Sequence, residues 1–130
     1  MEARGAEEFD GAFAALVRAG AEALIALPGG TLYRERQRLV ALATQHRLPA
    51  IYEHREYVDA GGLMSYGPNL DAMVYRVAYY VDRILKGTKP TDLPVEQPTQ
   101  FELVLNLPVA QALGLTLPPA FLFQVNEVLR

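Results

Sequence analysis

The sequence contains no cysteine and no tryptophan, only two histidines, and a single serine at position 65. Without cysteine there can be no disulfide framework, no thiolate nucleophile and no cysteine-based zinc site. His46 and His54 do not have the HxxxH or HExxH spacing of helical metal ligands, so we expect no metal ion and no cofactor. Ser65 lies in the sequence MSYG, which is not the GxSxG elbow of a hydrolase nucleophile. Catalysis therefore has little support.

The chain also lacks a basic excess and a long apolar run. Its formal net charge is −3, with no cluster of Lys and Arg to neutralise phosphates, so we expect no nucleic-acid partner. No apolar run reaches the roughly 18 residues that a membrane-spanning helix needs. The N-terminal stretch MEARGAEEFD is acidic and has no apolar segment typical of a secretory signal. The chain as written is therefore expected to be cytoplasmic.

What the chain does contain, in its first half, is a pattern of alternating helices and strands. Apolar residues at helical spacing predict helices over 7–19 and 31–46, the second capped by Thr31. Short apolar runs predict strands over 21–27 and 50–52, the first of them buried on both faces. Strand, helix and strand with short connections form a right-handed crossover. At 130 residues, we predict one α/β domain with an open, mainly parallel, three-layer sheet.

The strongest helical signal follows a third strand candidate at 63–66 and a break at Gly67-Pro68. Apolar residues between positions 70 and 85 repeat at helical spacing across four turns. Asn69 is a suitable N-cap for this helix, and Gly87 can end it.

The last third of the chain is punctuated by proline. Prolines at 90, 94 and 98 predict an extended connection, which leads to a strand over 101–105. Asn106 can cap a short helix, and Pro118-Pro119 can start a final helix that includes Val125, Val128 and Leu129.

Residues at the ends of the predicted strands are the candidates for ligand binding. Tyr52 and Tyr66 each end a strand, and Pro28 and Gly29 end the first strand in the same way. In open α/β sheets, ligands bind beyond the carboxyl ends of the strands. The structural alternative is that these tyrosines only cover strand ends with their hydroxyl groups in water.

His54 lies among Glu53, Arg55 and Glu56, a cluster with the residue types of a small metal or acid–base site. A solvated loop is favoured, because no third ligand is specified nearby. A small hydrolase built on Ser65, His54 and a nearby acid is the weakest alternative.

Three long stretches carry a resemblance to a known family: LATQHRLPAIYEHREYVDAGGLMSYGPNL, YVDRILKGTKPTDLPVEQPTQFELVLNLPVAQALGL and LPPAFLFQVNEVL. They resemble the ABC transporter substrate-binding proteins of periplasmic type I fold, in the branch with tryptophan- and tyrosine-type binding proteins. The resemblance covers essentially the whole chain but only the last part of the family's length. It implies a bacterial solute-binding component, or a C-terminal fragment of one, for a small solute such as an amino acid.

In that family, two α/β lobes close on a ligand at a hinge. The resemblance implies that residues 1–66 and 99–130 belong to the C-terminal lobe, and that 67–98 would pack on an N-terminal lobe that this chain lacks. It also implies an ABC permease as partner and an extracytoplasmic location. The ligand contacts carried over by resemblance are Pro28, Gly29, Tyr52, Ser65, Tyr66 and Asn69.

The alternative of a different class is a flavodoxin-like interaction or sensor domain that works through homodimerisation. Its basis is the apolar stripe of the helix over 69–86, which either folds back on its own sheet or pairs with a second copy.

Overall fold

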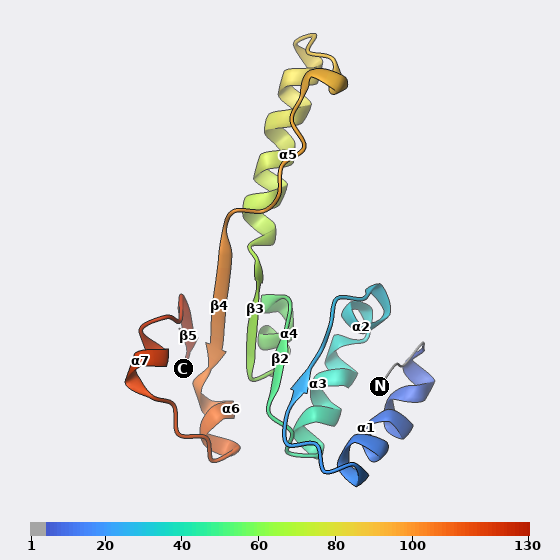
Figure 1. Ribbon diagram of the computed structural model, residues 1–130, viewed down its shortest axis with the longest axis vertical. Helices are drawn as coiled ribbons and strands as arrows, with labels where there is room; N and C mark the ends of the chain where they lie inside the picture. Colours follow the sequence, from blue (N-terminus) through green and yellow to red (C-terminus); the bar gives the residue numbers. More distant parts are fainter. Residues whose placement is uncertain (1–4) are drawn as a thin grey trace. The chain divides into compact units, whose positions relative to one another are not determined.

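The computed structural model describes residues 5–130, and the acidic N-terminal stretch, in which no secretory signal was expected, lies partly outside the described residues. The fold is α/β, as predicted, with helices on both sides of a mixed, mostly parallel five-stranded sheet of order β1-β2-β3-β4-β5 (Figure 1). The strands are β1 (Leu24–Ile25), β2 (Ala50–Tyr52), β3 (Met64–Pro68), β4 (Phe101–Asn106) and β5 (Glu127–Leu129). The helices are α1 (Phe9–Arg18), α2 (Gly30–Arg34), α3 (Arg36–Gln45), α4 (Arg55–Asp59), α5 (Leu70–Leu85), α6 (Leu107–Ala112) and α7 (Pro119–Leu122).

The chain divides into two compact units. We call the residues up to Gly67 together with Glu102–Arg130 the sheet unit, and Pro68–Phe101 the α5 unit. The sheet unit holds nearly all of the sheet, and the α5 unit consists of α5 and the segment that returns from it, with a 3-10 turn at Pro90–Asp92. None of the described helices combines the length and the apolar character that a membrane crossing requires.

Parallel pairing sets the register of the sheet. Leu24 pairs with Ala50, Tyr52 pairs with Ser65, and Leu105 pairs with Val128, all between parallel strands. Next to β3, the Asn106 N–H donates to the Leu63 carbonyl at 2.8 Å.

Two apolar clusters hold the sheet unit together. The larger one packs α1 and α3 against β2 and α4, and the smaller one joins the start of β3 to β4 and α6. Complete burial of a large aliphatic or aromatic side chain stabilises the folded state by about 1.5–3 kcal/mol. The most deeply buried apolar side chains of the sheet unit are Phe9, Val58, Val104, Leu105 and Ala110.

Three of the predictions that rested on local end signals are confirmed. The side chain of Asn69 accepts a hydrogen bond from the Ala72 N–H at 2.8 Å and so caps α5. Asn106 caps α6 in the same way, through the Val109 N–H at 3.2 Å. Gly87 ends α5 with φ +100°, which is a conformation that glycine adopts without strain.

Two expectations for the first half were wrong. The helix expected over 31–46 is broken at Glu35 into α2 and α3, and the N-cap of α2 is Gly29 rather than Thr31. The strand expected over 21–27 is only two residues long, and neither of its residues is fully buried. Ile25, in this strand, is 70% exposed.

Two further expectations were wrong in the second half. The break expected at Gly67-Pro68 is the last part of β3, which stays extended through Pro68. The final helix ends at Leu122, and β5 replaces its expected continuation. Asn126 explains this change, because its N–H donates to the Leu103 carbonyl at 2.9 Å and its side chain accepts from the Leu103 N–H at 2.8 Å. Pairing with β4 thus overrides the helical spacing.

We predict that Gly67→Ala destabilises the protein by about 1–3 kcal/mol. A Cβ atom on Gly67 would overlap the backbone carbonyl oxygen of Glu53, so one strand would have to shift. Urea denaturation followed by circular dichroism measures the loss. Gly11→Ala is the matched control, because that glycine lies within α1 and a Cβ there would meet nothing within 4 Å. The control should be more stable than the wild type by up to about 1 kcal/mol. Equal stability of the two variants would contradict the prediction.

Candidate functional site

The carboxyl ends of β1 and β2, together with the adjoining part of β3, form one edge of the sheet unit, which we call the rim. Ile25, Ile51 and Met64 are aligned in register, so β1 and β2 end beside the first residues of β3, which continues to Pro68. The loop that enters α2, the Glu53-His54 pair before α4, and Tyr66 of β3 therefore lie along this edge. The rim is therefore the edge at which an open α/β sheet binds ligands.

The structure brings three of the predicted ligand residues to the surface of the sheet unit at the rim. Tyr66 is 57% exposed on β3, and Pro28 and Gly29 are exposed in the loop that enters α2. Pro28 and Gly29 also line an apolar groove of about 500 Å³, together with Phe9 and Phe13 of α1. This loop thus presents backbone and an apolar wall to a ligand.

The other three predicted residues are not gathered there. Ser65 is only 1% exposed and lies beside the buried Tyr52, its partner in the parallel register. Asn69 belongs to the α5 unit, where its side chain is occupied as the cap of α5. Tyr52 and Ser65 lie beneath the rim rather than on it.

Tyr52 is held by its neighbours. Its ring stacks on the ring of Tyr57, with 4.7 Å between centroids and 7° between planes. A Cβ on Gly62 would lie only 2.8 Å from the Tyr52 ring, so glycine is required there for the ring to fit. Burial raises the pKa of Tyr52 well above its ordinary value, with the charge of ionised Tyr57 as a second cause. Burial also raises the pKa of Tyr57 to about 12, helped by the carboxylate of Glu53.

Tyr33 was missed by reasoning from the sequence. Its ring meets His54 edge-on at 5.7 Å and Tyr57 edge-on at 6.1 Å, and the guanidinium of Arg36 lies 5.2 Å from its centroid. The available signal was an aromatic residue in the first turn of a helix that directly follows a strand-end loop. Tyr33, Tyr52, His54 and Tyr57 form one aromatic cluster below the rim.

Polar atoms without a protein partner collect in the same region. His54 Nδ1, Glu56 Oε2 and Ser65 Oγ are buried and have no hydrogen-bond partner. On its other side, His54 Nε2 lies 3.4 Å from Glu53 Oε2. Buried polar groups in folded proteins are normally paired, so these three atoms represent unused hydrogen-bonding capacity. Within residues 5–130, no group of three or more His, Cys, Asp or Glu side chains could hold a metal ion.

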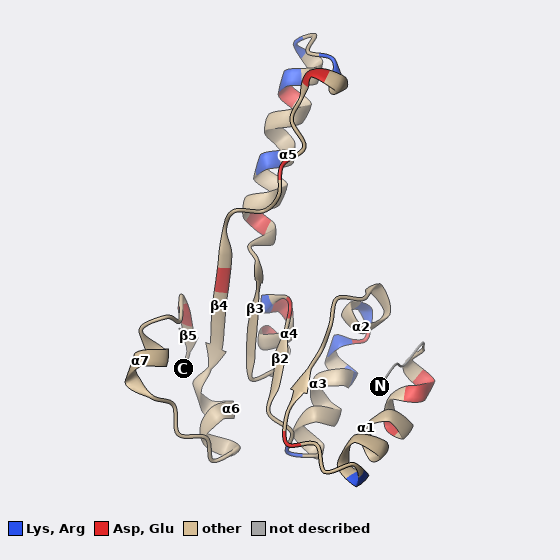
Figure 2. Ribbon diagram, viewed as in Figure 1, with Lys and Arg blue, Asp and Glu red and all other residues tan. Residues whose placement is uncertain are grey.

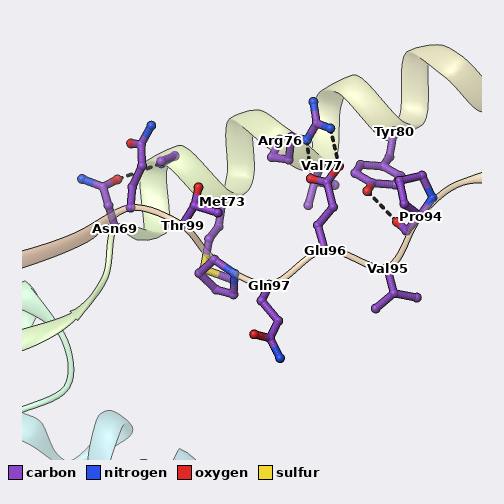
Figure 3. Close-up of a pocket in the computed structure, with 13 residues that line it drawn as sticks. Asn69, Met73, Arg76, Val77, Tyr80, Pro94, Val95, Glu96, Gln97 and Thr99 are labelled. Atoms are coloured by element: carbon purple, nitrogen blue, oxygen red, sulfur yellow. Dashed lines mark hydrogen bonds and ion pairs between the residues drawn. The ribbon is translucent and has the colours of Figure 1, made fainter.

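A separate groove of about 900 Å³ lies within the α5 unit, between α5 and the returning segment (Figure 3). Arg76 pairs with Glu96 through two hydrogen bonds, of 2.7 and 2.5 Å, and the Tyr80 hydroxyl donates to the Pro94 carbonyl at 2.7 Å. The hydrogen bond from Arg76 lowers the pKa of Glu96. These contacts fasten the returning segment to α5.

Another face of α5 is apolar and open within its own unit. We call it the α5 stripe. Its best exposed members are Val74, Val77, Val81 and Leu85. Acidic and basic residues lie at intervals along the same helix (Figure 2), and the spacing of the stripe keeps them off its centre.

The family model for ABC transporter substrate-binding proteins matches residues 6–129. The chain belongs to this family. A comparison with functionally described proteins gave no match.

Solved structures of related proteins share the fold of this substrate-binding family member. A conserved domain protein from Vibrio cholerae is 26% identical, with a TM-score of 0.87 over 98% of this chain and 43% of its own. The ABC domain from Streptococcus pneumoniae in complex with L-Trp is 22% identical, with a TM-score of 0.85 over 98% of this chain and 44% of its own. A ligand-free, open substrate-binding protein with adhesive properties from Clostridium difficile is 21% identical, with a TM-score of 0.65 over 94% of this chain and 40% of its own. The family member described here thus spans less than half the length of these structures.

We predict that the protein loses stability as pH rises from about 10 to about 12. In the unfolded chain a tyrosine loses its proton near pH 10, whereas Tyr57 in the folded protein keeps its proton to about pH 12. Between pH 10 and pH 12, ionisation of this tyrosine therefore stabilises only the unfolded state. The contribution of protonated Tyr57 to the free energy of unfolding is fully present below pH 10 and is lost as the pH rises towards 12. Urea denaturation at several alkaline pH values measures the slope.

Tyr57→Phe should decline less steeply than the wild type over the same window. Tyr75→Phe, at a side chain that is 83% exposed on α5, is the control and should keep the wild-type decline. Identical slopes for the wild type and Tyr57→Phe would refute the explanation.

Proposed function

We propose that this chain is a solute-binding component, or part of one, of an ABC-type uptake system for a small solute such as an amino acid. The family match over residues 6–129 supports the solute-binding role. The rim carries the proposal structurally, because exposed Tyr66 and the Pro28-Gly29 loop lie above buried polar atoms that have no protein partner. The chain acts by binding rather than by catalysis.

We propose further that the sheet unit forms one wall of the solute site. In this assignment, residues 1–66 and 99–130 correspond to the C-terminal lobe of the family, and residues 67–98 pack on an N-terminal lobe that supplies the other wall. The α5 stripe supports this assignment, since leaving large aliphatic side chains in water forgoes about 1.5–3 kcal/mol each. The proposed partner is an ABC permease, and the proposed place of action is outside the cytoplasm.

Within the rim, Pro28, Gly29 and Tyr66 would contact the solute, with the ring of Tyr66 as an apolar platform. Tyr52 and Ser65 would support that surface from below, and Asn69 would fix the chain where it leaves β3. The L-Trp bound to the Streptococcus pneumoniae neighbour supports an amino-acid-like solute.

A titration of the ¹⁵N-labelled chain with a panel of L-amino acids tests this site. We expect weak binding, in the millimolar range, because one wall buries too little of a small ligand to hold it tightly. The amide signals of Gly29 and Tyr66 should shift saturably with at least one member of the panel. Tyr66→Ala should abolish the shift at Gly29, whereas Tyr75→Ala on α5 should preserve it. Shifts that survive Tyr66→Ala unchanged would overturn the site.

The open α5 stripe supports a second candidate of a different class. A flavodoxin-like interaction domain could use this stripe to pair with a second copy of the chain. Val77 is 60% exposed and lies at the border of the stripe, where it also lines the groove of the α5 unit.

Light scattering distinguishes this candidate from solute binding. If the stripe mediates self-association, the wild type will have the mass of a dimer and Val77→Glu that of a monomer. Tyr75→Glu places the same charge on α5 away from the stripe and should leave the dimer intact. A monomeric wild type at millimolar concentration would exclude the dimer.

A further inference from the structure

A third cavity, of about 260 Å³, lies at the opposite end of the strands from the rim. It is contained within the sheet unit, between the end of α3, the starts of β2 and β3, and α6. Its lining is mainly apolar, and the largest contributors are Leu48, Tyr52, Leu63, Val109 and Leu113. It shares Tyr52 with the proposed solute site, but Pro28, Gly29 and Tyr66 do not line it.

The cavity is kept open by small residues and fixed backbone. Ala43, Ala50 and Ala112 line it and leave space where larger side chains would fill it. Gly62 borders the same space, and a Cβ there would lie 2.7 Å from the Tyr57 carbonyl oxygen and 2.8 Å from the Tyr52 ring. These four small residues therefore fix part of the wall of the cavity.

The only charged side chain in the lining is Arg47, and no carboxylate is among the described residues that line the cavity. Nearby, α6 and α7 carry no charged residue at all (Figure 2). The only hydrogen bond from the Arg47 guanidinium to another described residue is a long one, 3.5 Å to the Ala112 carbonyl. Its other N–H groups are therefore available to an anion.

The backbone of Arg47 is strained. Its φ is +53°, and it is the one described residue other than glycine with a positive φ. It follows α3 at the position where glycine is usual, with the Leu48 N–H donating to the Ala43 carbonyl at 2.9 Å. If this position served only to end α3, glycine would be favoured, because it adopts a positive φ without strain. The presence of arginine therefore points to a role for its side chain.

We propose that this cavity binds a small monocarboxylate with an apolar or aromatic body. The body would lie among the leucine side chains and Tyr52, and the carboxylate would pair with the guanidinium of Arg47. Such a site has the usual composition of a small-molecule pocket, which is an apolar lining with few polar groups. The guanidinium is suited to a carboxylate because it presents paired donors in a planar arrangement.

Benzoate is the probe, compared with benzyl alcohol and benzylamine, which have similar bodies and no negative charge. In ¹⁵N spectra of the full chain, benzoate should shift the amides of Gly61, Gly62 and Leu113 saturably and more strongly than benzyl alcohol. Benzylamine should have the least effect. Absence of shifts at these amides up to tens of millimolar benzoate, or equal binding of all three compounds, would overturn the proposal.

Arg47→Gly separates a binding role from a structural one. Glycine relieves the strained backbone, so this variant should be at least as stable as the wild type while binding benzoate on the order of tenfold more weakly. Arg47→Lys should retain most of the charge preference. Ala112→Leu should fill the cavity and abolish binding with Arg47 still present. Unchanged benzoate affinity in Arg47→Gly would show that the arginine only contacts α6 and would refute the proposal.

Discussion

The close approach of β3 to the chain segment after β2 is the constraint on which the sheet unit depends. It is made by two glycines, because a Cβ on Gly67 would overlap the Glu53 carbonyl and one on Gly62 would press on Tyr57 and Tyr52. With these contacts in place, Tyr52 stacks on Tyr57, and Ser65 lies beside Tyr52 in register. The same approach shapes both ends of the strands, since it supports the rim above and borders the cavity near Arg47 below.

Features encoded by neighbouring residues could be predicted from the sequence. The caps Asn69 and Asn106 are examples, because a cap needs only a side chain and an N–H three residues later. Strand β5 could not be predicted in this way, since it depends on the pairing of Asn126 with Leu103, which lies in a distant part of the chain. For the candidate site, predicted strand ends pointed to Pro28, Gly29 and Tyr66 as ligand candidates, and all three are exposed. Spacing alone could not show that Tyr52 is buried or that Tyr33 packs against Tyr57, on which Tyr52 stacks.

The two units differ in which side chains lack a partner within the unit: buried polar atoms in the sheet unit, and exposed apolar side chains in the α5 unit. The sheet unit packs two apolar clusters and leaves buried polar atoms of His54, Glu56 and Ser65 without a hydrogen-bond partner. In the α5 unit, the Arg76–Glu96 pair and the Tyr80 hydroxyl hold the returning segment, while the α5 stripe stays open. Under the proposed solute-binding role, a second wall would cover both the exposed part of the rim and the α5 stripe.

The account rests on the claim that the rim of the sheet unit is the solute-binding surface. The most direct test is a crystal structure of the chain grown with the amino acid that binds best, at a concentration of tens of millimolar. The account predicts electron density for the ligand against the ring of Tyr66 and the Pro28-Gly29 loop. Density located only in the groove of the α5 unit, or only beside Arg47, would contradict it.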